Sequence, residues 1–328
     1  MARRDTKPGE PVTRVLSIDP AGYRPHPIHA DERVWSETNC YVDLWVEVLH
    51  ALGLDPVPAT AAVLSADFDG HQWSFVKFAA EDLRALYGID VNEMNVWRPV
   101  LEHTAQELAQ GRLLTVEVDA FWLPDTAGIS YRTEHTKTTI VPNRLDSAAE
   151  CVEYFHNSGY YRLDGDDFRG VLHLDGASPE VLPPYIEMVR LDRLHPPNPD
   201  TELELVRAHL SRRPVRNPVA ALGQGVRVDV QWLRGGGLDA FHRWSFGVLR
   251  QCGAGAELAA DLSRHLSGRG VRGADDAAAL FQSVAVGAKG VQFRMARAAR
   301  GRAVALDEEL DGMAANWASA VGMLAASW

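Results

Sequence analysis

The stretch from residue 193 to residue 200 divides the chain into two parts of different character, and this division constrains the fold most strongly. It contains Pro196, Pro197 and Pro199, and proline interrupts helices and strands alike. Before it, apolar and β-branched runs alternate with short helical patterns, whereas alanine-rich segments of helical period follow it. The sequence therefore predicts an α+β domain over residues 1–195 and an all-α domain over residues 196–328.

The expected elements follow from periodicity and from turn residues. In the first domain we expect helices over 38–52, 81–87 and 96–110, and strands over 61–68, 73–78, 113–121, 135–142 and 151–155. Residues 1–30 predict an extended arm, and residues 143–149 predict a turn between the last two strands. In the second domain we expect helices over 201–212, 239–251, 254–266, 275–299 and 307–328. Three glycines at 235–237 predict a linker.

Charge and cysteine content exclude several classes of function. The 328 residues carry 44 acidic and 33 basic side chains, a net charge of −11, which argues against nucleic acid or an anionic membrane as the main partner. The three cysteines are far apart, so neither a disulfide framework nor a zinc site is expected, and a reducing cytoplasm fits best. Residues 1–10 lack the apolar core of a signal peptide, and no apolar run is long enough to span a membrane.

The strongest chemical signal lies at the start of the helix expected over residues 38–52. Thr38 or Asn39 is a suitable N-cap, and Gly53 is a suitable stop. Cys40 then lies in the first turn, where free N–H groups and the helix dipole favour a thiolate. This is the position of the nucleophile in papain-like enzymes. The alternative is a buried structural cysteine on a core helix.

A cysteine nucleophile needs a base and a group that orients the base. His135 opens a predicted strand and Asn157 follows the next one, so a hairpin would bring them together. The order Cys40, His135, Asn157 is the papain-type order. His156 competes for either of the last two roles.

Further polar side chains are candidates for binding the substrate or its oxyanion. The backbone N–H of Cys40 is one donor. The side-chain candidates are Asn39, Gln72, Asp119 and His156. Papain-like enzymes often carry a glutamine about six residues before the cysteine, where this chain has Val34.

Two other clusters suggest different chemistry. Asp119 and Asp125 flank an apolar run, and paired carboxylates suggest glycosidase or metal chemistry. A basic stripe late in the helix at 275–299 is either a solvated face or a docking site for an acidic carrier protein. The stripe consists of Arg294, Arg297, Arg300 and Arg302.

Four segments carry a family resemblance. They are residues 37–45 (ETNCYVDLW), 118–126 (VDAFWLPDT), 131–139 (YRTEHTKTT) and 154–161 (YFHNSGYY). On these segments the chain resembles the bacterial domain-of-unknown-function 1839 family over nearly its whole length. This resemblance by itself implies little about function.

A more distant similarity implies more. A helix-start cysteine, a strand ending in Asp-x-x-x-Leu-Pro and a strand-start histidine resemble the N-terminal domain of the butirosin-biosynthesis acyltransferase. That family is similar to the bacteriocin-leader cysteine peptidases of papain-like fold. By this resemblance Cys40 is the nucleophile, His135 the base and Asn157 the orienting group, while Asp119 and Pro124 match the strand-end motif. The related family more often has aspartate where this chain has Asn157.

The resemblance implies a papain-like acyl- or aminoacyltransferase. It would move an acyl group from the phosphopantetheine arm of a carrier protein to an amine or thiol acceptor through an acyl-enzyme on Cys40, with no bound cofactor. A cysteine hydrolase or amidase is the alternative enzyme. The non-enzymatic alternative is a papain-like scaffold that binds a partner protein without catalysis.

Overall fold

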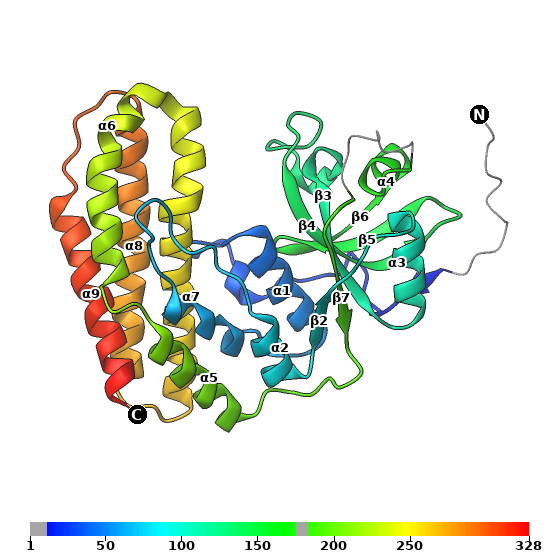
Figure 1. The fold of residues 1–328 in the computed structure, drawn as a ribbon, viewed down its shortest axis with the longest axis horizontal. Coiled ribbons are helices and arrows are strands. Elements are labelled where there is room, and N and C mark those ends of the chain that lie inside the picture. The colour runs from blue at the N-terminus through cyan, green and yellow to red at the C-terminus, as the bar shows by residue number, and fades with distance from the viewer. Residues whose placement is uncertain (1–11, 175–182, 328) are drawn as a thin grey trace. The chain divides into compact units, whose positions relative to one another are not determined.

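The computed structural model describes residues 12–174 and 183–327, so the expectation for residues 1–10 lies outside it. The protein has the predicted α+β class (Figure 1). Its chain divides into two compact units. The first comprises Met1–His26, Cys40–Leu54 and Leu83–Pro196, and the second comprises Pro27–Asn39, Asp55–Asp82 and Pro197–Trp328. Two early segments thus belong to the same unit as the chain after Pro196.

The first unit is built on one antiparallel sheet, with seven strands in the described residues. The strands are β1 (Thr13–Arg14), β2 (Asp90–Glu93), β3 (Leu113–Asp119), β4 (Lys137–Asp146), β5 (Cys151–His156), β6 (Gly159–Asp164) and β7 (Ile186–Arg190). Their order is β2-β7-β3-β4-β5-β6, and β1 pairs with β4. Asp119, the last residue of β3, is the register partner of Lys137, the first residue of β4. The register therefore brings the end of β3 to the start of β4.

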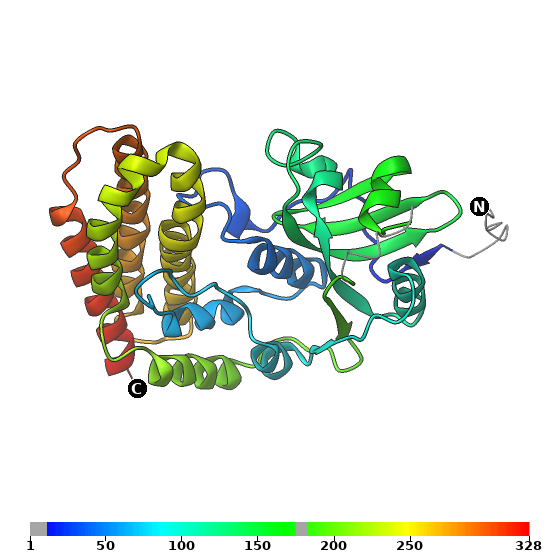
Figure 2. The same ribbon diagram turned by 45° about the horizontal axis from the view of Figure 1, so that its top comes forward.

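Helix α1 (Cys40–Ala51) covers this sheet and packs against β4, β5 and β6 (Figure 2). Every side chain from Tyr41 to Leu49 is buried, including the carboxylates of Asp43 and Glu47. The other helices of the unit are α3 (Val100–Ala109) and α4 (Gly165–Val171), with short 3₁₀ turns η3 (Ala120–Trp122) and η4 (Pro124–Thr126) after β3. Helix α2 (Ala80–Tyr87) spans the boundary between the units.

The second unit is dominated by long helices. They are α5 (Pro199–Arg212), α6 (Pro218–Ser245), α7 (Gln251–Gly268), α8 (Ala274–Ala299) and α9 (Asp307–Ala326). Helix α8 packs against α6, α7 and α9 (Figure 1). Asn198 and Asn217 accept hydrogen bonds from the first N–H groups of α5 and α6, each followed by proline at the first helical position, a common way to begin a helix. No helix among the described residues has the length and apolarity needed to cross a membrane.

The structure corrects the prediction of strands over 61–68 and 73–78. Residues Val57–Ser65 form a 3₁₀ helix, η2, and the only pairing described in this segment is an isolated bridge between Phe68 and Trp73. Prolines at 56 and 58 fix φ near the helical value, so the chain winds here although its apolar residues suggested a strand.

Three boundaries also differ from the prediction. Helix α3 begins only after Pro99, which occupies its N-cap. Strand β4 continues through Pro142 to Asp146, with a register shift just after the proline, so the predicted turn shrinks to the residues before β5. Helix α6 begins at Pro218, well before the predicted 239–251, and is interrupted at Gly237, whose φ is 70°. The glycine run therefore breaks a helix where the sequence predicted a linker.

Candidate functional site

A histidine and an aspartate meet where β3 ends and β4 begins. His135 Nδ1 lies 2.5 Å from Asp119 Oδ2. The other carboxylate oxygen accepts the backbone N–H groups of Phe121, at 3.0 Å, and Thr136, at 3.2 Å. These bonds fix the carboxylate, which in turn orients the imidazole. Since Nδ1 donates to Asp119, Nε2 carries the lone pair, on a side chain that is 72% exposed. The arrangement is that of an oriented general base.

An aromatic platform lies beside this histidine. The Phe121 ring stacks on the His135 ring with centroids 4.4 Å apart and planes 13° apart. Trp122 packs edge-on against Phe121 at 5.1 Å, and the guanidinium of Arg132 lies 4.5 Å from the Trp122 ring centroid. Arg132 also forms an ion pair with Asp167 at the start of α4. We call Phe121, Trp122 and Arg132 the aromatic platform. It limits the motion of His135.

Cys40 occupies the predicted first position of α1 and is partly exposed. Its neighbour Tyr41 donates a hydrogen bond of 2.9 Å to Glu187, which also accepts from Thr115 in the middle of β3. Asp119 lies four residues further along β3, which corresponds to about 13 Å of strand. The described residues include no hydrogen bond between Cys40 and His135. Through the Tyr41 hydroxyl, the start of α1 thus contacts Glu187 beside Thr115, whereas His135 contacts Asp119 at the end of β3.

The other two cysteines have different surroundings. Cys151 on β5 and Cys252 on α7 are both buried. Burial raises the pKa of each thiol. Cys40 is thus the accessible thiol among the described residues.

Asn157 forms the turn between β5 and β6. Its φ is 45°, a left-handed value that asparagine tolerates better than most residues, and its neighbours His156 and Gly159 are paired in the ladder. Among the described residues the Asn157 side chain makes no hydrogen bond. The triad of Cys40, His135 and Asn157 thus stays a prediction, and in the structure Asp119 is the group that orients His135.

Two of the predicted oxyanion donors belong to the second unit. The Asn39 amide donates to the Val76 carbonyl and to Gln251 Oε1, both at 3.1 Å, so both of its hydrogens have acceptors within the chain. Gln72 lies in an exposed turn where its backbone N–H donates to Asp69. Their role as oxyanion donors stays a prediction.

His156, by contrast, is buried in a network of side chains. Its Nδ1 lies 2.5 Å from Asp125 Oδ2, and Thr138 Oγ1 lies 2.7 Å from its Nε2. The Tyr154 hydroxyl donates to the other oxygen of Asp125 at 2.5 Å. His156 is 1% exposed and the Asp125 side chain 4%. Burial, and then the Asp125 charge, raise the pKa of Tyr154, so its hydroxyl stays protonated and remains a donor.

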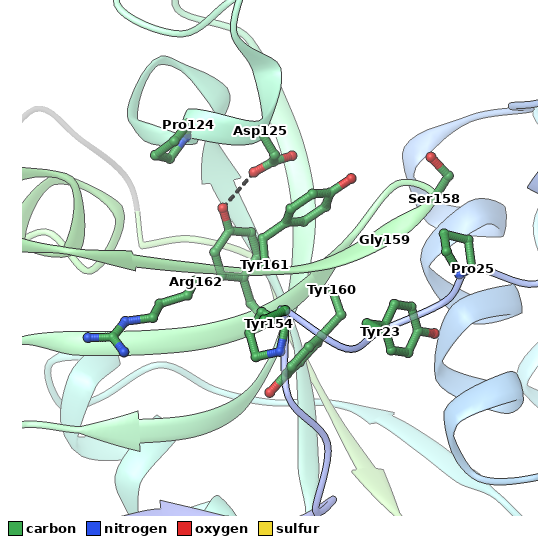
Figure 3. A pocket seen from close by; sticks show the side chains of 12 residues that line it. Tyr23, Pro25, Pro124, Asp125, Tyr154, Ser158, Gly159, Tyr160, Tyr161 and Arg162 are labelled. Atoms are coloured by element: carbon green, nitrogen blue, oxygen red, sulfur yellow. Dashed lines mark hydrogen bonds between the residues drawn. The ribbon is translucent and has the colours of Figure 1, made fainter.

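This network borders a cavity of about 560 Å³ (Figure 3). Its wall comes from the N-terminal arm, η4 and the β5–β6 hairpin. Four tyrosines line it: Tyr23, Tyr154, Tyr160 and Tyr161. Tyr23 donates its hydroxyl to buried Glu47, Tyr154 to Asp125 and Tyr160 to Glu153. Because these three hydroxyls are engaged with carboxylates, the rings contribute mainly carbon surface to the cavity. We call it the tyrosine cavity.

The Tyr154–Asp125 hydrogen bond gives a stability prediction. Replacing Tyr154 by phenylalanine leaves a buried carboxylate with one donor fewer, so the free energy of unfolding should fall by about 1–3 kcal/mol. Urea denaturation monitored by circular dichroism measures the change. Tyr131→Phe is the matched control, because Tyr131 also donates to an aspartate, Asp167, but is partly exposed. An equal loss in both variants would contradict the importance of the buried network.

Asp119, Asp125, His135 and His156 were all predicted site residues, but the structure pairs them differently: His135 with Asp119 and His156 with Asp125. The available signal was local: an aspartate ends one strand, a histidine opens the next, and antiparallel neighbours bring such ends together. The tyrosine cavity carried no comparable signal. Among the described residues, no group of three His, Cys, Asp or Glu side chains is placed to hold a metal ion.

Fold and site together define an α+β protein with an exposed, oriented histidine at one end of its sheet and an aromatic cavity beside a hairpin. Comparison with family models gives the particular family. The model of the DUF1839 N-terminal domain matches residues 24–191, and that of the DUF1839 C-terminal domain matches residues 197–326. The chain belongs to the DUF1839 family, which confirms the resemblance seen in the sequence. No curated protein matches the sequence.

Proposed function

We propose that this protein is an acyl- or aminoacyltransferase that moves an acyl group from a thioester to an amine or thiol acceptor. The observation that carries the proposal is the pair formed by His135 and Asp119. A fixed carboxylate holds the imidazole in one tautomer and stabilises it once it is protonated. The exposed Nε2 can then take a proton from an incoming nucleophile.

The first candidate mechanism uses Cys40. Its sulfur attacks the thioester carbonyl as its proton passes to His135, the bond to the donor sulfur breaks, and the donor takes that proton and leaves as a thiol. The acceptor amine or thiol then attacks the same carbonyl carbon, its proton passes through His135 to the Cys40 sulfur, and Cys40 is released. This mechanism is supported by the position of Cys40, which is partly exposed in the first turn of α1. It requires His135 and Cys40 to approach each other.

The second candidate mechanism omits the acyl-enzyme. His135 takes the proton of the acceptor amine, which attacks the thioester directly, and the donor thiolate leaves. The observation that favours it is the exposure of His135, whose described hydrogen-bond partner is Asp119 and not Cys40. Both mechanisms give the same products, so the enzyme class does not depend on the choice between them.

The proposal includes the finer features implied by the resemblance. They are a papain-like arrangement of the first domain, an all-α C-terminal domain, and a carrier protein whose phosphopantetheine arm presents the acyl group. An acidic carrier would be complementary to the arginines near the end of α8, of which Arg294 already forms an ion pair with Glu309. No bound cofactor is needed for either mechanism.

The test is to mix the full chain with an aminoacyl-loaded carrier protein and an amine acceptor. Intact-protein mass spectrometry follows both proteins. Transfer to the acceptor supports the proposal, and an adduct on wild type that is absent from Cys40→Ala supports the acyl-enzyme. Transfer that persists in Cys40→Ala favours the direct mechanism. Release of free acid without transfer indicates a hydrolase, and the absence of any turnover or adduct indicates a binding scaffold.

Thiol reactivity provides a separate prediction. Iodoacetamide at neutral pH should label Cys40 well before Cys151 and Cys252, because Cys40 is accessible, whereas burial hides the other two thiols and raises their pKa values. Peptide mapping of timed samples measures the three rates. Slow and equal labelling of all three cysteines would remove the case for an activated Cys40.

A further inference from the structure

A second set of side chains, in the second unit, has the connectivity of a serine hydrolase. Ser65, the last residue of η2, places Oγ 2.9 Å from His209 Nδ1, and His209 Nε2 lies 2.9 Å from Asp82 Oδ2. The His209 and Asp82 side chains are 4% and 6% exposed, whereas Ser65 is only partly buried. Ser65, the nucleophilic end of this chain of hydrogen bonds, is therefore the residue nearest solvent.

The hydrogen bonds fix the proton positions. Because Asp82 accepts from Nε2–H, Nδ1 carries the lone pair that faces Ser65. Arg212 Nη2 lies 3.2 Å from Nδ1 and 3.3 Å from Nε2. An atom this close to both nitrogens lies over the ring face, since an in-plane position would overlap a ring carbon. The Nδ1 lone pair thus remains directed at Ser65, whose single hydroxyl hydrogen can be donated either to Nδ1 or to the Ala62 carbonyl 3.0 Å away.

Ser65 and His209 open into a cavity of about 400 Å³. Its charged lining side chains are Lys77 and Arg212, and the exposed ring of Phe75 forms part of its wall. Asp82 is paired with His209 and does not line the cavity. The cavity therefore has a positive lining beside a hydroxyl with an adjacent oriented base, a combination that suits an anionic substrate.

We propose that Ser65, His209 and Asp82 form a second catalytic centre that cleaves carboxylic esters or thioesters bearing an anionic group. Ser65 Oγ forms a bond to the carbonyl carbon while its proton passes to His209 Nδ1. The carbon–oxygen or carbon–sulfur bond of the substrate breaks, and the leaving group takes that proton. Water, deprotonated by the same imidazole, then attacks the acyl-serine and restores the hydroxyl. Asp82 stabilises the imidazolium in both steps.

The experiment uses a fluorophosphonate probe on the full chain, because such probes react with serines activated by a base. Wild type should be labelled at Ser65 by peptide mapping, and Ser65→Ala should not. His209→Gln should slow labelling by about 10²-fold or more. Ser74→Ala is the matched control: Ser74 also lines the cavity, but its described hydrogen bonds are to the backbone of Asp67 and none is to a histidine, so labelling should be unchanged.

Two further measurements keep the proposal falsifiable. Circular dichroism establishes that each variant is folded, and Asp82→Asn should slow labelling if His209→Gln does not fold. Hydrolysis of 4-nitrophenyl succinate should exceed that of 4-nitrophenyl acetate, and Lys77→Ala should reduce this preference. Absence of probe on Ser65 in wild type, or equal labelling in folded His209 and Asp82 variants, would overturn the proposal. Cys40→Ala and His135→Gln should still be labelled, so the two sites are tested independently.

Discussion

Replacing His135 by glutamine is expected to lower the rate of acyl transfer by about 10²–10⁴-fold, the usual contribution of a general base. Glutamine keeps a polar side chain of similar reach but cannot accept a proton at neutral pH. Asp119→Asn should produce a large part of the same loss, because the amide no longer fixes the imidazole tautomer that presents Nε2. Rates are measured from acyl-carrier consumption at saturating acceptor.

His195→Gln is the matched control for this prediction. His195 is also exposed and belongs to the same unit, but its ring nitrogen contacts only the carbonyl of the neighbouring Pro196 among the hydrogen bonds described. Its replacement should leave transfer within about twofold of wild type, since surface substitutions usually have small effects. Equal activity of the folded His135 and His195 variants would exclude His135 as the base.

Gly170→Ala is expected to destabilise the protein by about 3 kcal/mol, through overpacking against Trp122. A β-carbon built at this glycine of α4 lies 2.1 Å from the Trp122 ring, which is a steric clash. Because the indole is rigid, the whole ring must move to relieve it. Since Trp122 packs against Phe121, and Phe121 stacks on His135, the change should also lower transfer activity. Thermal unfolding and the transfer assay measure the two effects.

The control for steric conflict is a helical glycine with open space around it. Gly312 lies within α9, and apart from the adjoining backbone of that helix no atom lies within 4 Å of a β-carbon built there. Gly312→Ala should therefore be neutral or stabilising by about 0.5–1 kcal/mol, because alanine has the higher helix propensity. If Gly170→Ala and Gly312→Ala had equal free energies of unfolding, Trp122 would be able to move without cost. The aromatic platform would then not be rigid.

The parts of the fold that were predictable are those encoded by local patterns. Helix α1 shows a 3.6-residue period from Tyr41 onward, and β3 and β5 are apolar runs bounded by polar residues, so each was found close to its observed limits. The 3₁₀ helix at Val57–Ser65 was not predicted, because a short apolar run fits a strand or a helix equally well. Here the prolines at 56 and 58 favour the helical conformation.

The candidate site was predictable only in part. Asp119 and His135 were both predicted as site residues, but His135 was expected to pair with Asn157 through the hairpin of β4 and β5. The structure joins it to Asp119 through β3 and β4 instead, because the register places Asp119 opposite Lys137. Ser65 and His209 lie 144 residues apart, and no local pattern indicates a contact over that separation.

The discontinuity of the two units has a consequence for how such proteins evolve. Two early residues make hydrogen bonds to the helices of the second unit. Asp82 bonds His209, and the backbone N–H of Trp35 donates to Glu257 at 2.7 Å. Both early residues are encoded before position 196, within the region matched by the DUF1839 N-terminal domain. A recombination event between the two family regions would remove structural partners from the helices that follow. The two regions are therefore constrained to be inherited together, as one evolutionary unit.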